Sequence, residues 1–200
     1  MINYVKIIVT LLFVASMQAC QNSNRNIDLL NNLLKSKVIL PVGSMEVICS
    51  KQEVNMVHQK NYYKVILYND SAVCSPCEVK SLLEWGYYSS SLKKEKGIDL
   101  SIIPIFSPSS KDYNSLKCAI KNVKPSFPVY IDRDNGVMKN NPQIPSNPLF
   151  HTLILDHEDK VVLVGNPLRN VEIEKLFLQL VSENLDGKKP LTQNKTKQKE

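Results

Sequence analysis

The sequence predicts a mixed α/β fold, in which a central β-sheet is covered by helices on both faces. Two apolar, β-rich runs, 62–69 and 98–106, each precede a segment with helical periodicity, which is typical of parallel strands joined by helices. Near the C-terminus, a short turn joins the runs 149–156 and 161–164 as a hairpin. Because a hairpin adds antiparallel strands to a parallel sheet, the sheet is expected to be mixed.

The first residues carry an export signal. Lys6 precedes an apolar run over 7–17, which is too short to span a bilayer, so residues 1–19 are predicted to be a signal peptide. The segment Met17-Gln18-Ala19-Cys20 resembles a bacterial lipobox, which implies that Cys20 becomes the lipidated first residue of a lipoprotein. The alternative is ordinary cleavage nearby, which leaves a soluble exported protein with a free Cys20.

Residues 20–60 are predicted to be a tether and an N-terminal extension. The residues that follow Cys20 are polar, as in a flexible linker. Apolar residues at helical spacing predict a short helix over 27–36. The next segment, 37–48, has strand composition but is interrupted at Pro41-Val42-Gly43, which indicates a hairpin.

The first half of the predicted domain, 61–185, is a strand–helix–strand unit. Run 62–69 has the composition of a strand buried on both faces. Residues 78–96 have helical spacing, and Gly97 is a suitable helix end. Run 98–106 follows as a second central strand, in which Pro104 predicts a bulge or a strand end.

The second half continues with a helix, a strand and a long loop before the hairpin. An apolar stripe predicts a helix that ends near Val123, and 127–132 reads as a third strand. The polar, proline-containing segment 135–148 predicts a loop. Asn170 is expected to cap the last helix, and the charged tail 186–200 is expected to be disordered.

Cys74-Ser75-Pro76-Cys77 stands between the first central strand and the helix that follows it. A cysteine at a helix N-terminus meets unpaired backbone N–H groups and the positive end of the helix dipole, which favour the thiolate. The thiolate is the attacking species in disulfide exchange, and one helical turn brings two cysteines of this spacing into range. The motif therefore predicts redox chemistry, with Ser75 and Pro76 tuning the balance between dithiol and disulfide.

In this setting the domain resembles thioredoxin-like, membrane-tethered thiol-disulfide oxidoreductases of the TlpA/ResA type. The resemblance is carried by the cysteine motif, by strand 128–132, and by the hairpin segments 153–156 and 160–165. It implies a three-layer thioredoxin-like fold, with Cys74 as the attacking and Cys77 as the resolving thiol and with no organic cofactor. Proline before the second cysteine slightly favours a reductase.

The sequence departs from this family at several positions around the cysteines. Val73 stands where thioredoxins have tryptophan, and Tyr68 stands where they have a buried acid. The family's cis-proline would fall at Phe150. Either the loop is two residues longer and Pro148 is the cis-proline, or the segment 149–151 lines the site without a cis-proline. Pro148, Phe150 and His151 are accordingly candidate substrate-binding residues, and His151 could alternatively be an ordinary strand histidine.

Two other interpretations of the cysteine pair stay open. The pair could be half of a zinc site, but Cys49, Cys118 and the three histidines show no matching spacing, so no metal is predicted. It could instead be a structural disulfide in a binding or sensing lipoprotein that has lost redox catalysis. Cys49 and Cys118 are expected to be free thiols that are mostly buried, with a disulfide between them as the alternative.

Charge and composition limit the partners. The chain has a net charge of +6, but five lysines and only two acidic residues occupy its last 15 positions. Without a basic stripe interleaved with aromatic residues, nucleic-acid binding is not predicted. The expected partners are cysteine-containing exported proteins or an electron-donating thiol protein. The expected location is the bacterial cell envelope, on a lipid anchor that faces the periplasm.

Overall fold

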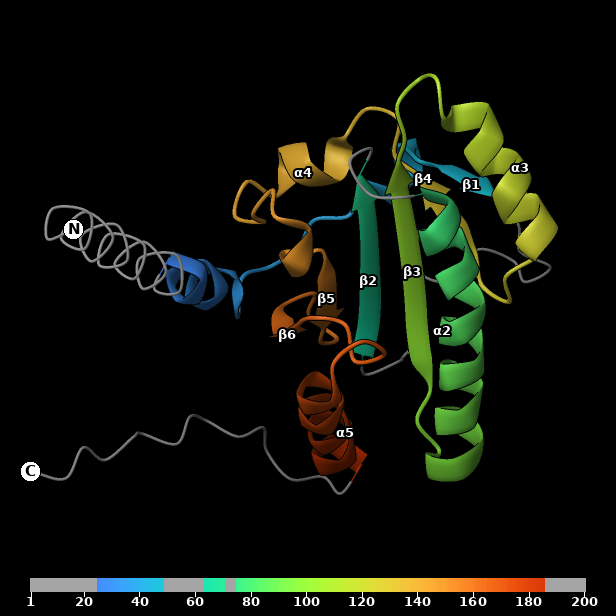
Figure 1. The fold of residues 1–200 in the computed structure, drawn as a ribbon. Helices are drawn as coiled ribbons and strands as arrows, with labels where there is room; N and C mark the ends of the chain where they lie inside the picture. Colours follow the sequence, from blue (N-terminus) through green and yellow to red (C-terminus); the bar gives the residue numbers. More distant parts are fainter. Residues whose placement is uncertain (1–24, 49–62, 71–74, 186–200) are drawn as a thin grey trace, which may run out of the picture.

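The fold is a six-stranded mixed β-sheet with helices on both faces (Figure 1). The computed structural model describes residues 25–48, 63–70 and 75–185. The strand order across the sheet is β1-β4-β3-β2-β5-β6. The strands have these bounds: β1 Glu46–Ile48, β2 Tyr63–Asp70, β3 Leu100–Ser107, β4 Val129–Ile131, β5 Thr152–Leu155 and β6 Val161–Val164.

The centre of the sheet is parallel and its two sides are antiparallel. Strand β2 pairs with β3 over its whole length, from Tyr63 opposite Leu100 to Asp70 opposite Ser107, and β3 pairs with β4. On one side β5 and β6 add as an antiparallel hairpin, and on the other β1 pairs antiparallel with β4. The predicted fold class and mixed sheet are therefore confirmed.

Three long helices cover one face of the sheet. They are α2 Ser75–Lys96, α3 Tyr113–Val123 and α5 Val171–Leu185. Their apolar side chains meet those of the sheet in a first core that includes Trp85, Ile120 and Phe177. Gly97 ends α2 with a φ of +69°, and the Asn170 side chain accepts the N–H groups of residues 172 and 173 at the start of α5, as predicted.

The opposite face is covered by shorter segments. A helix over 25–33, the 3-10 helices η1 Val42–Ser44 and η3 Pro148–Phe150, and the short helix α4 Gly136–Asn140 lie there. A second core on this face includes Leu33, Tyr68 and Phe150. Part of the predicted N-terminal extension is thus packed against the sheet.

Three local predictions differ from the structure. Segment 37–48 forms no hairpin, because β1 pairs with β4 instead. Pro104 lies inside β3 without a bulge, opposite Leu67, and the ladder with β4 begins only at the next residue. The polar segment 135–148 contains α4, whose start is held by the Asp132 carboxylate accepting two backbone N–H groups at 2.8 Å.

Candidate functional site

The cysteine motif lies at the carboxyl end of β2, where the chain enters α2. Cys74, like Cys20 and Cys49, lies outside the described residues. Ser75, Pro76 and Cys77 form the first turn of α2, and only their backbone is described. The sequence position of Cys74, directly before the first residue of a 22-residue helix, is the arrangement that the dipole argument requires.

A pocket of 450 Å³ lies beside the first turn of α2. It is bounded by the end of β2, by the segment that leads into β5, and by the turn between β6 and α5. Of the predicted substrate-binding residues, Pro148 and His151 line it, whereas Phe150 is buried in the second core. Glu78, which follows Cys77 directly, also lines it.

Glu78 is held by an ion pair across the pocket. The guanidinium of Arg169, in the turn before α5, donates to the Glu78 carboxylate at 2.8 Å. The Glu78 side chain is largely buried, whereas that of Arg169 is more than half exposed. The pair joins the first turn of α2 to the segment before α5. The sequence did not predict Arg169, because the two residues are 91 positions apart.

His151 is a buried histidine with one unsatisfied ring nitrogen. Its side chain is 3% exposed, and Nε2 lies 3.0 Å from the carbonyl oxygen of Pro145. Because a carbonyl only accepts, Nε2 carries the proton and Nδ1 is left as a buried acceptor without a partner among the described residues. Burial lowers the pKa of His151, although the carbonyl of Pro145 and the charge of Asp70 oppose this effect.

Tyr68 occupies the position at which thioredoxins, which the sequence resembles, have a buried acid. Its ring meets that of His151 edge to face, with centroids 5.2 Å apart, and its hydroxyl donates to Asn135 at 2.6 Å. Burial raises the pKa of Tyr68 to about 12, so the phenol stays protonated at neutral pH. Tyr68 packs in the second core, on the face opposite α2. Strand alternation gives the α2 face to Asn69 instead, which is buried and lines the pocket.

Pro148 opens η3 at the rim of the pocket. Every peptide bond between described residues is trans, including the one that joins Asn147 to Pro148. The Asn147 side chain accepts the Leu149 N–H at 3.1 Å, which holds the turn. Leu149 is 74% exposed beside the pocket, so this rim offers an apolar surface to a partner. Within the segment 149–151, Leu149 and His151 line the pocket and Phe150 does not.

The remaining predicted features have these positions. Cys118 is a free thiol but is exposed rather than buried, because Leu116 and Ile120 form the buried side of α3. The single tryptophan, Trp85, is buried in the first core. Within 25–48, 63–70 and 75–185, no cluster of three or more His, Cys, Asp or Glu side chains could hold a metal ion. No helix in the same ranges is long and apolar enough to cross a membrane. The lipidation site and the tail 186–200 lie outside them.

No protein-family model and no curated protein sequence matches the chain. Solved structures do match. A thioredoxin-like protein from Bacteroides caccae is 17% identical with a TM-score of 0.47, and the match covers 82% of this chain but only 56% of that protein. A putative thiol:disulfide interchange protein DsbE from Chlorobium tepidum is 18% identical with a TM-score of 0.47, over 74% of this chain and 96% of the other.

An exposed lipoprotein thioredoxin from Streptococcus pneumoniae is 20% identical with a TM-score of 0.43, over 62% of this chain and 88% of the other. At such identities and TM-scores, these likenesses carry no argument about activity. The fold rests on this chain's own element order, in which a parallel strand–helix–strand unit begins at the cysteine motif and an antiparallel hairpin and a helix end the sheet. The chain therefore has a thioredoxin-like α/β fold.

Proposed function

We propose that the protein is a thiol-disulfide oxidoreductase that acts on cysteines of other proteins through Cys74 and Cys77. One observation carries the proposal: a Cys-x-x-Cys motif whose second cysteine lies in the first turn of the long helix that is the next described element after the central parallel strand β2. The Cys74 thiolate attacks a disulfide sulfur of the partner and forms a mixed disulfide. The Cys77 thiol then attacks Cys74, which releases the partner's thiol and leaves a Cys74–Cys77 disulfide.

The pocket beside α2 supports this chemistry. Leu149 offers an apolar contact for the partner's chain, and Glu78 and Arg169 offer polar ones next to Cys77. No organic cofactor is required, because both electrons pass between sulfur atoms. The reducing direction is favoured by Pro76, as in the family that the sequence resembles.

The test is a redox titration of the purified protein combined with single cysteine variants. We expect one reversible two-electron couple between about −120 and −270 mV, and a value near the lower limit identifies a reductase. Cys77→Ser should accumulate mixed disulfides with partner proteins, because the resolving thiol is gone, whereas Cys74→Ser should trap none. Cys118→Ser is the matched control and should titrate as the wild type does. A protein without a reversible couple, and whose Cys77→Ser variant traps nothing, would contradict the proposal.

We further propose that the protein acts in the bacterial cell envelope, anchored by lipid at Cys20 and facing the periplasm. The support is the export signal and the lipobox-like segment before Cys20. Its partners there are cysteine-containing exported proteins or an electron-donating thiol protein. Mass spectrometry of the mature protein decides this: a diacylglycerol adduct on Cys20 is expected, and an unmodified N-terminus at another residue contradicts anchoring.

A second candidate function is that of a thioredoxin-fold binding or sensing lipoprotein. It is favoured by Tyr68, whose hydroxyl is bonded to Asn135 in the second core, so this position supplies no acid to the α2 side of the sheet. This candidate predicts a permanently oxidised cysteine pair and partner binding that is unchanged when both cysteines are replaced by serine. The titration described above separates the two candidates.

A further inference from the structure

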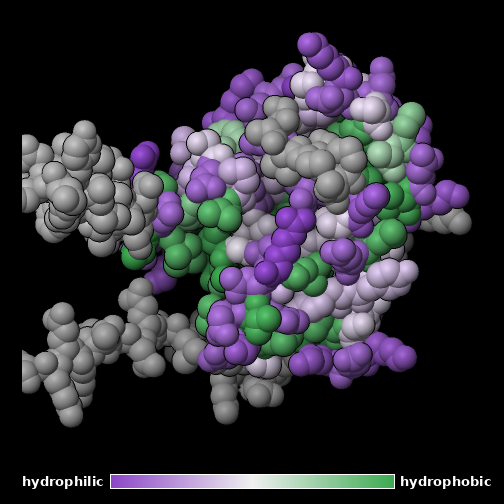
Figure 2. Space-filling view, in the orientation of Figure 1, coloured by the Kyte–Doolittle hydropathy of each residue, from purple (hydrophilic) through white to green (hydrophobic). Residues whose placement is uncertain are grey.

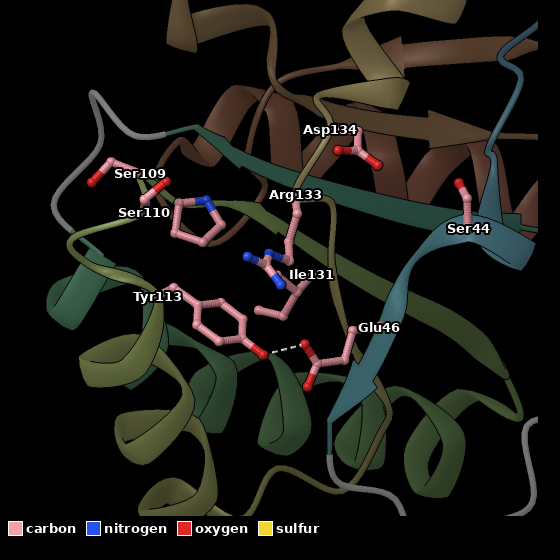
Figure 3. A pocket seen from close by; sticks show the side chains of 9 residues that line it. Ser44, Glu46, Ser109, Ser110, Tyr113, Ile131, Arg133 and Asp134 are labelled. Atoms are coloured by element: carbon pink, nitrogen blue, oxygen red, sulfur yellow. Dashed lines mark hydrogen bonds between the residues drawn. The ribbon is translucent and has the colours of Figure 1, made fainter.

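A second pocket, of 480 Å³, lies at the carboxyl ends of β3 and β4 (Figure 3). Its walls come from three segments: Ser44 and Glu46 at β1, Pro108 to Tyr113 at the start of α3, and Ile131 to Asp134 after β4. None of its lining residues belongs to the pocket beside α2. Its volume falls in the range of ligand pockets, about 300–1,000 Å³. In the strand order, β3 and β4 lie on one side of β2, and β5 and β6 lie on the other. The two pockets therefore lie on opposite sides of the end of β2.

Arg133 is held in position within this pocket. Its guanidinium carbon lies 4.7 Å from the centroid of the Tyr113 ring, a cation–π distance. Tyr113 is fixed in turn, because its hydroxyl donates to the Glu46 carboxylate at 2.5 Å. Figure 3 shows the guanidinium beside the Tyr113 ring, with Asp134 and Ser44 farther from that ring on two separate segments. The Arg133 side chain is exposed to solvent, but its contact with the Tyr113 ring holds the guanidinium in position.

No ion pair joins Arg133 to a described residue. The carboxylate nearest to the ring, that of Glu46, already has a cation of its own, because Lys117 donates to it at 2.5 Å. The bonds from Lys117 and Tyr113 and, more weakly, the charge of Arg133 lower the pKa of Glu46, so it is ionised at neutral pH. Arg133 also forms no hydrogen bond to a described residue. A planar guanidinium with free donors is suited to the two oxygens of a carboxylate.

A second acid in the pocket restricts the charge of the ligand. Asp134 lines the pocket, and no ion pair joins it to Arg133. At the same distance its carboxylate repels a phosphate dianion about twice as strongly as the single charge of a peptide carboxylate, and it can accept a backbone N–H from a polypeptide. A peptide that carries one carboxylate satisfies both residues, whereas a phosphate group satisfies only Arg133.

The pocket lies near the end of β2, the strand that precedes the cysteine motif in the sequence. Asp70 lies opposite Ser107 and Phe106 lies opposite Ile131, so the ends of β2 and β4 are two strand spacings apart, roughly 10 Å. Cys74 is the fourth residue after Asp70 in the sequence. An extended polypeptide advances about 3.3 Å per residue, so two to five residues cover roughly 7–17 Å.

We propose that this pocket binds a carboxylate of the polypeptide substrate through Arg133, and that it thereby selects proteins with an acidic residue about two to five positions from the reacting cysteine. The inference rests on the thiol-disulfide function proposed above and names its substrate class. Arg133 is a specificity residue that contacts the substrate away from the reacting sulfur atoms. The exchange chemistry itself does not require it.

The test uses a peptide with one cysteine in a mixed disulfide with 2-mercaptoethanol, and with Glu or Gln three positions away. The prereduced full chain reacts in a single turnover: both thiols of the peptide mixed disulfide are released and the Cys74–Cys77 disulfide forms. At low ionic strength we expect the wild type to release the Glu peptide about three- to tenfold faster than the Gln peptide, and salt to reduce this preference. Arg133→Gln should react equally with both peptides.

Two further variants distinguish recognition by Arg133 in the pocket from a general effect of the protein's net charge. Arg133→Lys keeps the charge but loses the planar fork, so its preference should be intermediate. Lys121→Gln removes one positive charge from an exposed position of α3 outside the pocket and should keep the full preference. An equal loss in Lys121→Gln and Arg133→Gln would overturn the inference.

Failure of the inference and failure of the function give different results. If the wild type reduces both peptides at the same rate, the function stands and the carboxylate site is refuted. If neither peptide is reduced in a Cys74-dependent reaction, the oxidoreductase function is refuted. Anisotropy with labelled peptides whose cysteine is serine then decides the pocket: binding that needs both Glu and Arg133 supports it, and equal binding of the Glu and Gln peptides overturns it.

Discussion

His151 is a buried residue of the candidate site that can gain a proton as the pH falls. It lies under the rim formed by η3, beside Tyr68, with Nε2 bonded to Pro145 and Nδ1 unpaired. A proton on Nδ1 would place a buried positive charge there without a described hydrogen-bond partner. The fold therefore favours the neutral ring, which agrees with the lowered pKa of His151.

We expect His151 to make the protein less stable in acid. Because its pKa is lowered in the folded state from 6.5, the unfolded chain binds a proton that the folded chain rejects as the pH falls below this value. The free energy of unfolding should therefore decrease as the pH falls from about 7.5 to about 5. His151→Gln, whose Nε2 can still donate to Pro145, should lose much of this decrease. Urea unfolding at both pH values measures it.

His157→Gln is the matched control for this prediction, because His157 is an exposed turn residue. This variant should keep the pH dependence of the wild type. If His151→Gln and His157→Gln unfold with the same pH dependence, the buried neutral state of His151 does not contribute to acid lability.

At the scale of elements, the short helix α4 was the main feature that the sequence did not predict. Its five residues carry no complete apolar stripe, so the polar composition of 135–148 indicated a loop. The structure holds it by bonds to its ends: Asp132 accepts its first N–H groups, and Asn141 follows its last residue. The sequence contains one signal for the end of this helix, which is Asn141 after Val137 and Met138. Asparagine is common just after the last residue of a helix.

Asn141 ties α4 to the N-terminal segment. It is fully buried, and its amide accepts the Ile39 N–H at 2.7 Å and donates to the carbonyls of Ile39 and Val137 at 2.8 and 2.7 Å. Asn141→Ala leaves these backbone groups without their partner. We expect it to lower the free energy of unfolding by about 2–4 kcal/mol, measured by urea denaturation.

The neighbouring Asn140→Ala serves as the control, since Asn140 is exposed and should change the free energy of unfolding by less than about 0.5 kcal/mol. Asn141→Asp should not restore stability, because a carboxylate would face the two carbonyl oxygens. Equal stability of the two alanine variants would show that the bonds from Asn141 to Ile39 are replaced by water at no cost.

At the scale of the whole molecule, the two cores on opposite faces of the sheet make the N-terminal segment part of the fold. Leu33 is completely buried in the second core, and β1 forms an edge of the sheet next to β4. The loop between Leu33 and β1 also pairs with the hairpin, where Val38 N–H donates to Asp159. On the side seen in Figure 2, hydrophobic and hydrophilic residues are interspersed.

We expect Leu33→Ala to destabilise the whole domain by about 2–5 kcal/mol, because it leaves a cavity in the second core. The single tryptophan, Trp85, lies in the first core across the sheet and reports unfolding by its fluorescence. Ile27→Ala is the control: Ile27 is 52% exposed on the same helix and should cost about 0.5 kcal/mol or less. A Trp85 transition that is unchanged in Leu33→Ala would show that 25–48 unfolds separately.

The sequence alone determined the fold class, the parallel centre of the sheet, the terminal hairpin and the position of the cysteine motif at the start of a helix. Each of these depends on local patterns: β-rich runs, helical spacing, caps such as Asn170, and a two-residue spacing of cysteines. The sequence also pointed to Pro148 and His151, which line the pocket beside α2, because both lie within a few residues of the recognisable hairpin.

Only the tertiary structure decided which distant residues share a site. Glu78 meets Arg169, Arg133 lies on Tyr113, and β1 pairs with β4, although no sequence pattern relates the members of any of these pairs. The physical reason is that such contacts depend on strand order and register, which are set by packing over the whole sheet. The pocket at Arg133, which we propose binds a carboxylate, is therefore a property of the folded chain, because its lining residues form no sequence motif and come together only in the fold.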